Sequence, residues 1–457
     1  MKRATLLIVL ALAAPAAAQT KLDIPYTQFR LPNGLTVILH EDHSVPLVTV
    51  NVWYHVGSAR ERAGRTGFAH LFEHLMFEGS QHYDRGYFHP LQEAGASLNG
   101  STNADRTNYW EVVPTNALDL ALWMESDRMG YLLPALTDAK FENQRDVVLN
   151  ERRQNYENRP YGLAGMAIVA ALYPADHPYH WLTIGAAEDV RAAHIDDVRA
   201  FFQRYYHPRN ASLAMAGDIE PDRGLALAEH YFAEIPGGTK PDRVSVPAPQ
   251  LPKDDVRMVI EDRVELPRLY LAWHSPALFA DGDAELDLVA EVLSSGKTSR
   301  LYRALVYEQR IATEVAASQN SREMGSFFQI VATAAPGRTL AEVERAIARE
   351  MAKLIERGPT DLELERCLAQ AEAHFLFRLQ TVGGFGGKSD QLNAYNTFLG
   401  DPGYFARDLE RYRSATPALL RAAAVAYLKP SGRVILSVVP RGRLALALPG
   451  SRPVVVS

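Results

Sequence analysis

The sequence has a single cysteine, Cys367, among its 457 residues. One cysteine cannot form a disulfide bond within the chain, and it also excludes a zinc site built from several thiolates. Free cysteines in folded proteins usually behave as small, buried apolar residues. We therefore expect Cys367 to lie in a hydrophobic core and not to act as a nucleophile.

Runs of basic residues are also absent. The chain carries 48 lysines and arginines against 54 acidic residues, which gives a formal net charge of −6. Proteins that bind nucleic acids usually present a basic patch or stripe, so we expect no nucleic-acid partner. Apolar residues make up 47% of the chain and charged residues 22%, an ordinary balance for a globular protein. The length is sufficient for two or three domains.

Beyond the N-terminus, no apolar run is long enough to span a membrane. At the N-terminus, two basic residues precede an apolar segment that continues to Ala14, and three alanines follow at 16–18. This order is typical of a secretory signal peptide that is cleaved after Ala18. We therefore expect an exported, periplasmic protein of a Gram-negative bacterium, with no stable membrane insertion after signal cleavage.

The segment Phe68–Phe77 contains residues that can bind a metal ion. It reads FAHLFEHLMF, and its large apolar side chains, without glycine or proline, predict a buried helix. On a helix, His70 and His74 are about one turn apart and share a face, so both imidazoles can hold one ion. Glu73 lies beside them. A glutamate directly before the second histidine is the inverted form of the zinc-peptidase motif.

Two histidines do not complete a catalytic zinc site, which usually has three protein ligands and an open fourth position. The best candidate for the third ligand is Glu151, which follows His74 after 76 residues in a segment with helical spacing. Two imidazoles and one carboxylate favour zinc over calcium or magnesium. In such a site zinc activates a water molecule and Glu73 acts as general base. The alternative is a structural histidine pair, with Glu151 paired to Arg152 or Arg153 on the surface.

The motif and its spacing to Glu151 resemble the pitrilysin/insulinase family of zinc peptidases, which includes the mitochondrial processing peptidase. The resemblance covers nearly the whole mature chain. The other matching segments are NGLTV at 33–37, GS at 57–58, LNGST at 98–102, HPY at 177–179, IG at 184–185 and SRLY at 299–302. The resemblance implies a short, two-domain bacterial member and the zinc-bearing subunit of its pair. It assigns one Zn²⁺ per chain to His70, His74 and Glu151, and the role of catalytic base to Glu73.

The sequence repeats its pattern after a segment rich in proline, glycine and charge. Residues 427–436 (YLKPSGRVIL) correspond to 205–214 (YYHPRNASLA), and in both copies a helix ends before a proline turn and a strand. We predict an α+β fold with two homologous α/β-sandwich domains, each a mostly antiparallel sheet covered by helices. Only the first domain has the metal motif. The predicted bounds are 1–18 for the signal peptide, 19–235 for the zinc-binding domain, 236–254 for the linker and 255–457 for the second domain.

Residues 97–102 form the second candidate for a functional segment. In the family, an edge strand with an Asn-Ala pair near the zinc pairs with the substrate backbone, and here the pair reads Asn99-Gly100. An extended peptide would join the sheet as an added strand, so its main chain would be bound and sequence preference would be weak. The alternative is an ordinary sheet strand.

Two features depart from the family pattern. The family often has a glutamate seven residues before the zinc-binding glutamate, and here Gln144, which cannot supply a charge, stands in its place behind the ligands. Active members also carry an arginine and a tyrosine that contact the substrate carbonyl, and the aligned positions hold Val306 and Thr313. Arg303 and Arg310 are near but out of register.

A complete chamber in the family contains four domains, and this chain supplies two. The resemblance therefore implies a dimer, either with a homologous subunit that keeps the arginine–tyrosine pair or with a second copy. We interpret the glycine-dense segment 381–388 as a mobile wall or hinge of the chamber. The expected function is a zinc metalloendopeptidase acting on peptides or small unfolded proteins in the periplasm. Two alternatives stay open: a non-catalytic assembly or core subunit, and a dedicated peptidase for one exported precursor.

Overall fold

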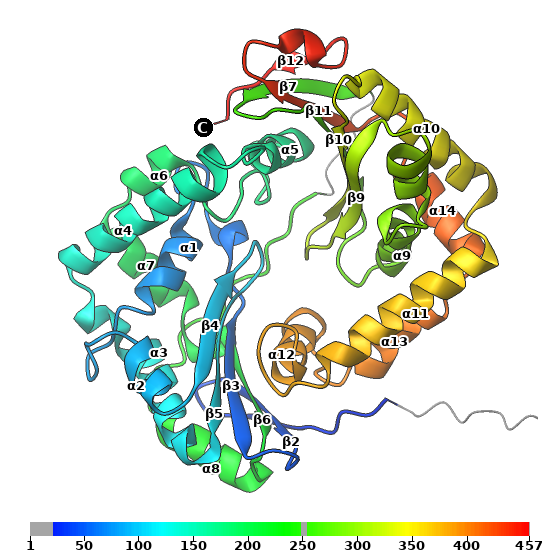
Figure 1. Cartoon of the computed structure of the whole chain (residues 1–457). Helices are drawn as coiled ribbons and strands as arrows, with labels where there is room; N and C mark the ends of the chain where they lie inside the picture. Colours follow the sequence, from blue (N-terminus) through cyan, green and yellow to red (C-terminus); the bar gives the residue numbers. More distant parts are fainter. Residues whose placement is uncertain (1–21, 248–253, 457) are drawn as a thin grey trace, which may run out of the picture.

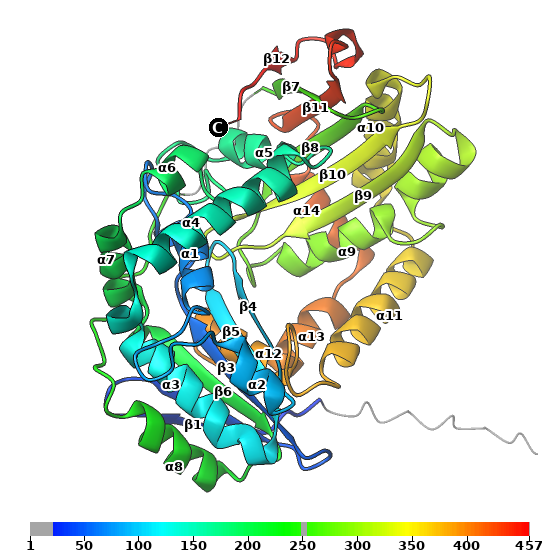
Figure 2. The ribbon, with the colours of Figure 1, turned by 60° about the vertical axis from the view of Figure 1, so that its left-hand side comes forward.

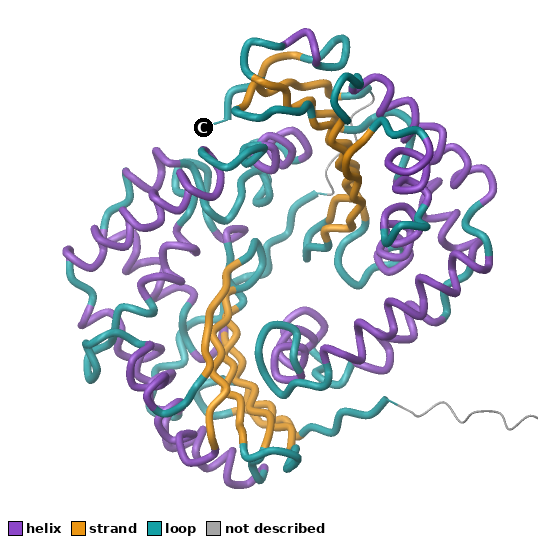
Figure 3. The backbone as a smooth tube through the Cα atoms, viewed as in Figure 1, coloured by secondary structure: helices purple, strands orange, loops and turns teal. Residues whose placement is uncertain are grey.

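The computed structural model describes residues 22–247 and 254–456. The predicted signal peptide and part of the predicted linker lie outside these ranges. The chain forms a curved molecule with one six-stranded sheet in each half (Figure 1). Most helices lie on the outer side of the curve, and the sheets lie toward its inner side (Figure 3). None of the helices in the described ranges is long and apolar enough to cross a membrane.

The first sheet has the strand order β1-β2-β6-β3-β5-β4. Its strands are β1 (Thr27–Arg30), β2 (Thr36–Glu41), β3 (Leu47–Tyr54), β4 (Ser97–Thr102), β5 (Thr107–Pro114) and β6 (Ala211–Gly217). Only β2 and β6 pair in parallel; the other neighbours are antiparallel. The hairpin of β1 and β2 turns at Gly34, whose φ of 95° is the left-handed conformation that glycine adopts without strain.

Helices cover one face of this sheet. They are α1 (Phe68–Leu75), α2 (Phe88–Glu93), α3 (Leu118–Ala135), α4 (Asp138–Arg152), α6 (Ala187–Arg191), α7 (Ile195–Tyr205) and α8 (Pro221–Phe232). Alternate residues of β3, such as Val50 and Val52, belong to the same hydrophobic core as Phe72 of α1 and Phe202 of α7. The period of two along the strand thus directs one set of side chains toward the helices.

The second half repeats the first. Its sheet has the order β12-β7-β11-β8-β10-β9. The strands are β7 (Val256–Asp262), β8 (Arg268–Ser275), β9 (Ala312–Asn320), β10 (Ser326–Ala334), β11 (Val434–Pro440) and β12 (Arg452–Pro453). Five strands reproduce the order β2-β6-β3-β5-β4 of the first sheet, including the parallel pair. The predicted α+β fold with two related units is therefore confirmed.

The helices of the second half lie on the outer side of its sheet, some directly on the strands and others on a neighbouring helix. They are α9 (Asp283–Ser294), α10 (Leu340–Arg357), α11 (Asp361–Arg378), α13 (Phe405–Arg413) and α14 (Pro417–Tyr427). Cys367 of α11 is fully buried in their core, as predicted. The matching segment SRLY at 299–302 has a structural role here. Arg300 donates two hydrogen bonds of 2.7 Å to the carboxylate of Glu363, which joins the segment to α11.

Each half also places one helix on the sheet of the other half (Figures 1 and 2). Helix α5 (Ala164–Leu172) follows the metal motif in sequence, yet Ile168 packs in one cluster with Leu436 of β11. Helix α12 (Lys388–Leu399) comes from the second half, and Leu392 packs with Ile38 and Ala214 of the first sheet. The sequence did not predict this exchange, because an apolar helix face does not identify the sheet that it covers.

A buried polar network fastens α12 to the first sheet. Asp390, in the first turn of α12, accepts hydrogen bonds from Trp53 Nε1 at 2.8 Å and from Asn108 Nδ2 at 2.9 Å. Its second oxygen accepts the backbone N–H of Gly386 at 2.8 Å. Because buried polar groups are costly unless they are paired, these donors fix both the helix and the preceding glycine-dense segment.

The glycine-dense segment 381–388 is a packed wall. A Cβ atom added at Gly383 would stand 2.2 Å from Thr49 Oγ1, so the backbone lies directly on the sheet. Phe385 packs edge-to-face on Trp110 of β5, with ring centroids 5.4 Å apart. The sequence suggested a mobile wall or hinge, whereas these contacts hold the segment against strands β3 and β5.

Replacement of Asp390 by alanine leaves the donors of Trp53, Asn108 and Gly386 without their buried acceptor. We expect Asp390→Ala to lower the free energy of unfolding by about 2–4 kcal/mol. Urea unfolding followed by tryptophan fluorescence measures the loss, since Trp53 reports on this contact. Asp281→Ala, at an exposed position, is the control. Equal unfolding midpoints for the two variants would contradict the role of Asp390.

Candidate metal centre

Helix α1 carries the two motif histidines and begins at a buried cap. Its N-cap residue Gly67 has a φ of 88°. The carboxylate of Glu61 accepts the backbone N–H groups of Gly67 at 3.0 Å and Ala69 at 2.8 Å, and Trp181 Nε1 at 3.0 Å. Burial raises the pKa of Glu61 to about 8, while the three N–H donors favour its charged form. Glu61 could not be recognised from the sequence, because it lies six positions before the N-cap and no capping box has that spacing.

The structure brings His70, His74 and Glu151 together. The Nε2 atoms of the two histidines are 3.4 Å apart, and each lies 3.6 Å from Glu151 Oε2. In a tetrahedral zinc site with bonds of about 2.0–2.1 Å, neighbouring ligand atoms are about 3.4 Å apart. The three atoms therefore match three corners of such a site, and the donor set of two imidazoles and a carboxylate suits zinc.

Helix α4 positions Glu151 in its last turn, directly against α1 (Figures 1 and 2). The neighbouring arginines are occupied elsewhere. Arg152 is buried and donates to the backbone oxygen of Gly185 at 3.1 Å, and it also pairs with Glu157. Arg153 donates to Asn150. Within the described residues, Glu151 thus has no arginine partner, and the surface pairing considered from the sequence is not formed.

The two histidine side chains lie in a sheltered place, with exposed fractions of 17% and 19%. Burial, together with the neighbouring His74, lowers the pKa of His70 to about 4. A neutral imidazole with its proton on Nδ1 presents the lone pair of Nε2 to an ion. The buried Nδ1 of His70 has no hydrogen-bond partner in the part of the chain that the structure describes.

Glu73 lies in the same cavity as two of the proposed ligands. The cavity has a volume of about 230 Å³ and is lined by His70, Glu73, Ser101, Thr102, Glu151, Asn155, Tyr156, Thr183 and Ile184. Burial raises the pKa of Glu73, and the opposing influences are the hydroxyl of Thr102 and the charges of His74 and Arg106. A carboxylate of raised basicity in a cavity next to a metal site is able to accept a proton from water.

Strand β4 lies at the edge of the first sheet, next to this cavity. The backbone N–H of Asn103 donates to Arg106 O at 3.0 Å in the β4–β5 hairpin. Because bonded and non-bonded pairs alternate in antiparallel ladders, the main-chain groups of Leu98, Gly100 and Thr102 face away from β5. Asn99 folds back over this free edge, where its Oδ1 accepts the N–H of Gly100 at 2.8 Å.

Glycine stands at position 100 because two aromatic rings fill the space of a side chain. An added Cβ would lie 2.9 Å from Tyr109 Cδ1 and 3.0 Å from Phe77 Cζ. The Asn-Gly pair in place of Asn-Ala is therefore a consequence of the packing below β4. The glycine does not change the main-chain edge that β4 offers to an added strand.

Other residues singled out from the sequence lie outside the cavity. Gln144 donates to Glu78, beyond the end of α1, and forms no hydrogen bond with the three proposed ligands. Thr313 lies in β9, where its hydroxyl donates to Thr333 O at 3.4 Å. Arg303 is exposed and pairs with Glu308 at 2.7 Å. Arg303 therefore does not substitute for the missing arginine.

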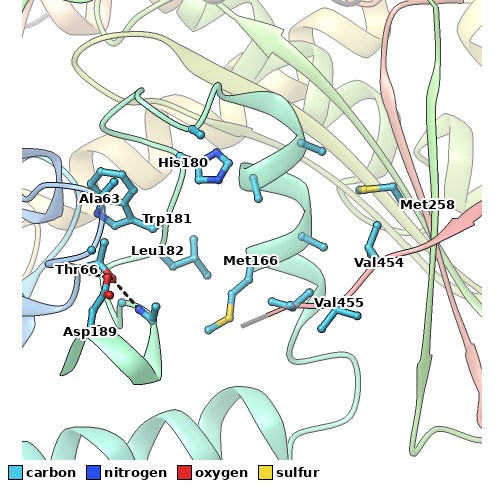
Figure 4. Close-up of a pocket in the computed structure, with 18 residues that line it drawn as sticks. Ala63, Thr66, Met166, His180, Trp181, Leu182, Asp189, Met258, Val454 and Val455 are labelled. Carbon is cyan, nitrogen blue, oxygen red and sulfur yellow. Dashed lines mark hydrogen bonds between the residues drawn. The ribbon is translucent and has the colours of Figure 1, made fainter. Parts of the chain in front are cut away.

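A larger cavity, of about 530 Å³, lies between α5 and the C-terminal residues (Figure 4). Its lining is mainly apolar, with Met166 and Val455 among the side chains drawn, and it includes none of the three proposed ligands. At one end Thr66 donates its hydroxyl to Asp189 at 2.6 Å, just before α1 begins. This cavity borders the cap of α1 and is separate from the three proposed ligands.

Removal of one ligand is expected to abolish tight zinc binding. We expect the mature chain to bind one zinc ion and Glu151→Gln to bind it about 100-fold more weakly or worse, because a neutral amide is a poor ligand. Competition with a chromogenic chelator measures the affinity. Glu157→Gln is the matched control, since Glu157 pairs with Arg152 on the same segment. Equal zinc affinity of both variants would show that Glu151 is not a ligand.

Comparison with known proteins identifies the family. Residues 36–177 match the family described as Insulinase (Peptidase family M16), and residues 193–371 match the Peptidase M16 inactive domain. Zinc protease PqqE of Helicobacter pylori is 29% identical over 392 residues, covering 83% of this chain and 86% of that protein. The structure of a protease from Helicobacter pylori aligns with a TM-score of 0.82 at 25% identity, over 92% of this chain and 100% of the other. The first half of the periplasmic protease PqqL from Escherichia coli shares the fold, with a TM-score of 0.74 and 18% identity over 93% and 94% of the chains. The chain therefore belongs to the insulinase family of peptidases, family M16.

Proposed function

We propose that the chain is a zinc metalloendopeptidase that hydrolyses peptides or small unfolded proteins. One observation carries the proposal: the Nε2 atoms of His70 and His74 and Oε2 of Glu151 lie 3.4–3.6 Å apart, with Glu73 in the same cavity. The names of relatives such as Zinc protease PqqE support the same chemistry. A non-catalytic core subunit would not need these four side chains together.

Different residues of the chain have different roles in the proposed hydrolysis. A zinc ion held by His70, His74 and Glu151 would polarise the scissile carbonyl and acidify a water molecule. A carboxylate oxygen of Glu73 would accept a proton from water and pass it to the nitrogen of the leaving amine. The hydroxyl of Thr102 lines the same cavity and opposes the rise in the pKa of Glu73. The raised pKa of Glu73 makes it a stronger base than an exposed glutamate.

The edge of β4 holds the substrate in an extended form. A peptide added beside β4 would bond to the outward main-chain groups of Leu98, Gly100 and Thr102, and it would displace the side chain of Asn99 from the N–H of Gly100. Because these contacts are to the backbone, they give little sequence preference. We therefore propose Asn99 and Gly100 as substrate-binding residues of the enzyme.

Activity should depend on Glu73. We expect Glu73→Gln to reduce the hydrolysis of a mixed quenched-peptide library by about 10²–10⁴-fold, because the amide cannot accept the proton. Zinc content should be unchanged, since Glu73 is not one of the three proposed ligands. Glu93→Gln, an exposed position near the motif, is the control. Full activity of Glu73→Gln with zinc bound would refute the proposed mechanism.

We also propose that the working enzyme is exported and contains a homologous partner subunit. The N-terminal sequence supports export, and a structural relative is named a periplasmic protease. The aligned positions of the arginine–tyrosine pair hold Val306 and Thr313, and Arg303 is occupied by Glu308. A partner that retains the pair would complete the site. A homodimer and a peptidase dedicated to one exported precursor remain the alternatives.

The partner hypothesis predicts that the isolated chain is slow. We expect peptide cleavage by the purified mature chain to rise at least about tenfold when the homologous subunit is added, because a missing oxyanion donor typically costs 10²–10³ in rate. Co-purification followed by peptide hydrolysis measures this gain. If the chain alone cleaves peptides as fast as any mixture, the partner is not part of the active enzyme.

A further inference from the structure

The cleft beside the metal centre continues beyond the cavity that contains Glu73. A second cavity of about 230 Å³ is lined by Ser58, Asn103, Ala104, Asp105, Trp181, Leu182, Thr183, Asn320, Ser321 and Arg322. Thr183 lines both cavities, and the segments 101–105 and 181–184 run along both. The two cavities are thus consecutive parts of one cleft. Its far end is formed by the loop between β9 and β10 of the second half.

Arg322 is the cation at this far end. Its guanidinium lies 5.1 Å from the ring centre of Tyr179 and 5.0 Å from that of Phe327, so the two rings hold it in place. The side chain is only partly buried. No ion pair and no side-chain hydrogen bond of Arg322 occurs within residues 22–247 and 254–456. Its N–H donors are therefore available to the cavity that it lines.

The acidic groups nearest to Arg322 are already engaged. Asp105 accepts the hydroxyl of Tyr179 at 2.5 Å and the backbone N–H of Glu323 at 3.1 Å. The carboxylate of Glu323 pairs with His55 Nε2 at 2.7 Å. The same contacts, together with the N–H of Met324 on Tyr179 Oη at 3.0 Å, fasten the loop to the first half. Arg322 is thus a positioned cation and not a flexible surface side chain.

We propose that Arg322 binds a carboxylate of the peptide substrate at the far end of the cleft. This inference rests on the proposed function. A peptide that lies along β4 and continues past Thr102 enters the second cavity, since an extended chain advances about 3.3 Å per residue. The planar guanidinium fork accepts a carboxylate with two parallel hydrogen bonds, and its stacking on two rings leaves those donors pre-oriented. The carboxylate is either the C-terminus of a short peptide or an acidic side chain.

Binding to an inactive chain tests the proposal without hydrolysis. The probes are fluorescein-labelled decapeptides of one sequence in three forms: neutral with an amidated end, the same with a free C-terminal carboxylate, and the same with one glutamine replaced by glutamate. They are titrated by fluorescence anisotropy against the mature, zinc-loaded Glu73→Gln chain. We expect one or both acidic forms to bind about 10-fold more tightly than the neutral form. The preferred form identifies the source of the carboxylate.

Three double variants separate binding from structure. Adding Arg322→Gln should remove the preference for acidic peptides and leave binding of the neutral peptide unchanged. Arg322→Lys should keep part of the preference, because it keeps the charge but not the fork. Arg303→Gln is the matched control, since it removes an exposed arginine of the same half. It should behave like the parent chain.

The outcomes distinguish this proposal from the proposed function. Equal affinity of the parent chain for all three peptides would overturn the carboxylate site alone. If Arg322→Gln lowered the affinity for all three peptides equally, the carboxylate site would also be overturned. Arg322 would then have a structural role, stacking between the two halves. Absence of binding by every peptide, the neutral one included, would overturn the proposed function and the carboxylate site together.

Discussion

Each sheet of this protein has two faces to cover, and the helices of its own half cover only one of them. The other face is covered by a helix that belongs, in sequence, to the other half: α5 on the second sheet and α12 on the first. Separation of the halves would expose both apolar faces and the buried Asp390 network. The two halves are therefore held in one relative position, and the cleft between them has a defined shape.

The proposed metal centre depends on how α1 is held in place. Glu61 and Trp181 hold its N-terminus, and Gly67 lies so close to Gly185 that a Cβ on Gly185 would stand 2.4 Å from Gly67 N. Helix α4 then places Glu151 against the exposed side of the histidine pair. The result is a set of three donor atoms at a spacing that suits zinc, beside a cavity that also contains the carboxylate of Glu73.

The two halves show how one fold serves two purposes. In the first, the helix after β3 carries the histidines. In the second, the corresponding helix α9 has Asp283 at its start, buried and paired with Arg411 at 2.9 Å. This ion pair joins α9 to α13, whereas the corresponding helix of the first half carries the histidine pair. The second half contributes to the cleft through its loop at Arg322, which reaches across to Asp105 and Tyr179 of the first.

Local patterns in the sequence were enough to predict the main helices and strands and to propose the two histidines and Glu73 as site residues. The spacing of His70, Glu73 and His74 predicts one helical face, Asn33-Gly34 predicts the hairpin, and the repeated segment near residues 205 and 427 predicts two related units. Glu151 was found through the family's spacing. These features are encoded by residues close in sequence or by a motif with a fixed interval, so they can be read without coordinates.

The tertiary structure alone decided which distant groups meet. The exchange of α5 and α12, the cap at Glu61, the acceptor Asp390 and the stacked Arg322 depend on contacts between segments that are far apart in the chain or lack a recognisable spacing. The sequence does not distinguish a charged residue that is buried in the fold from one that is exposed. Its role follows from the partners that surround it, and burial and pairing are properties of the folded chain and not of any local pattern.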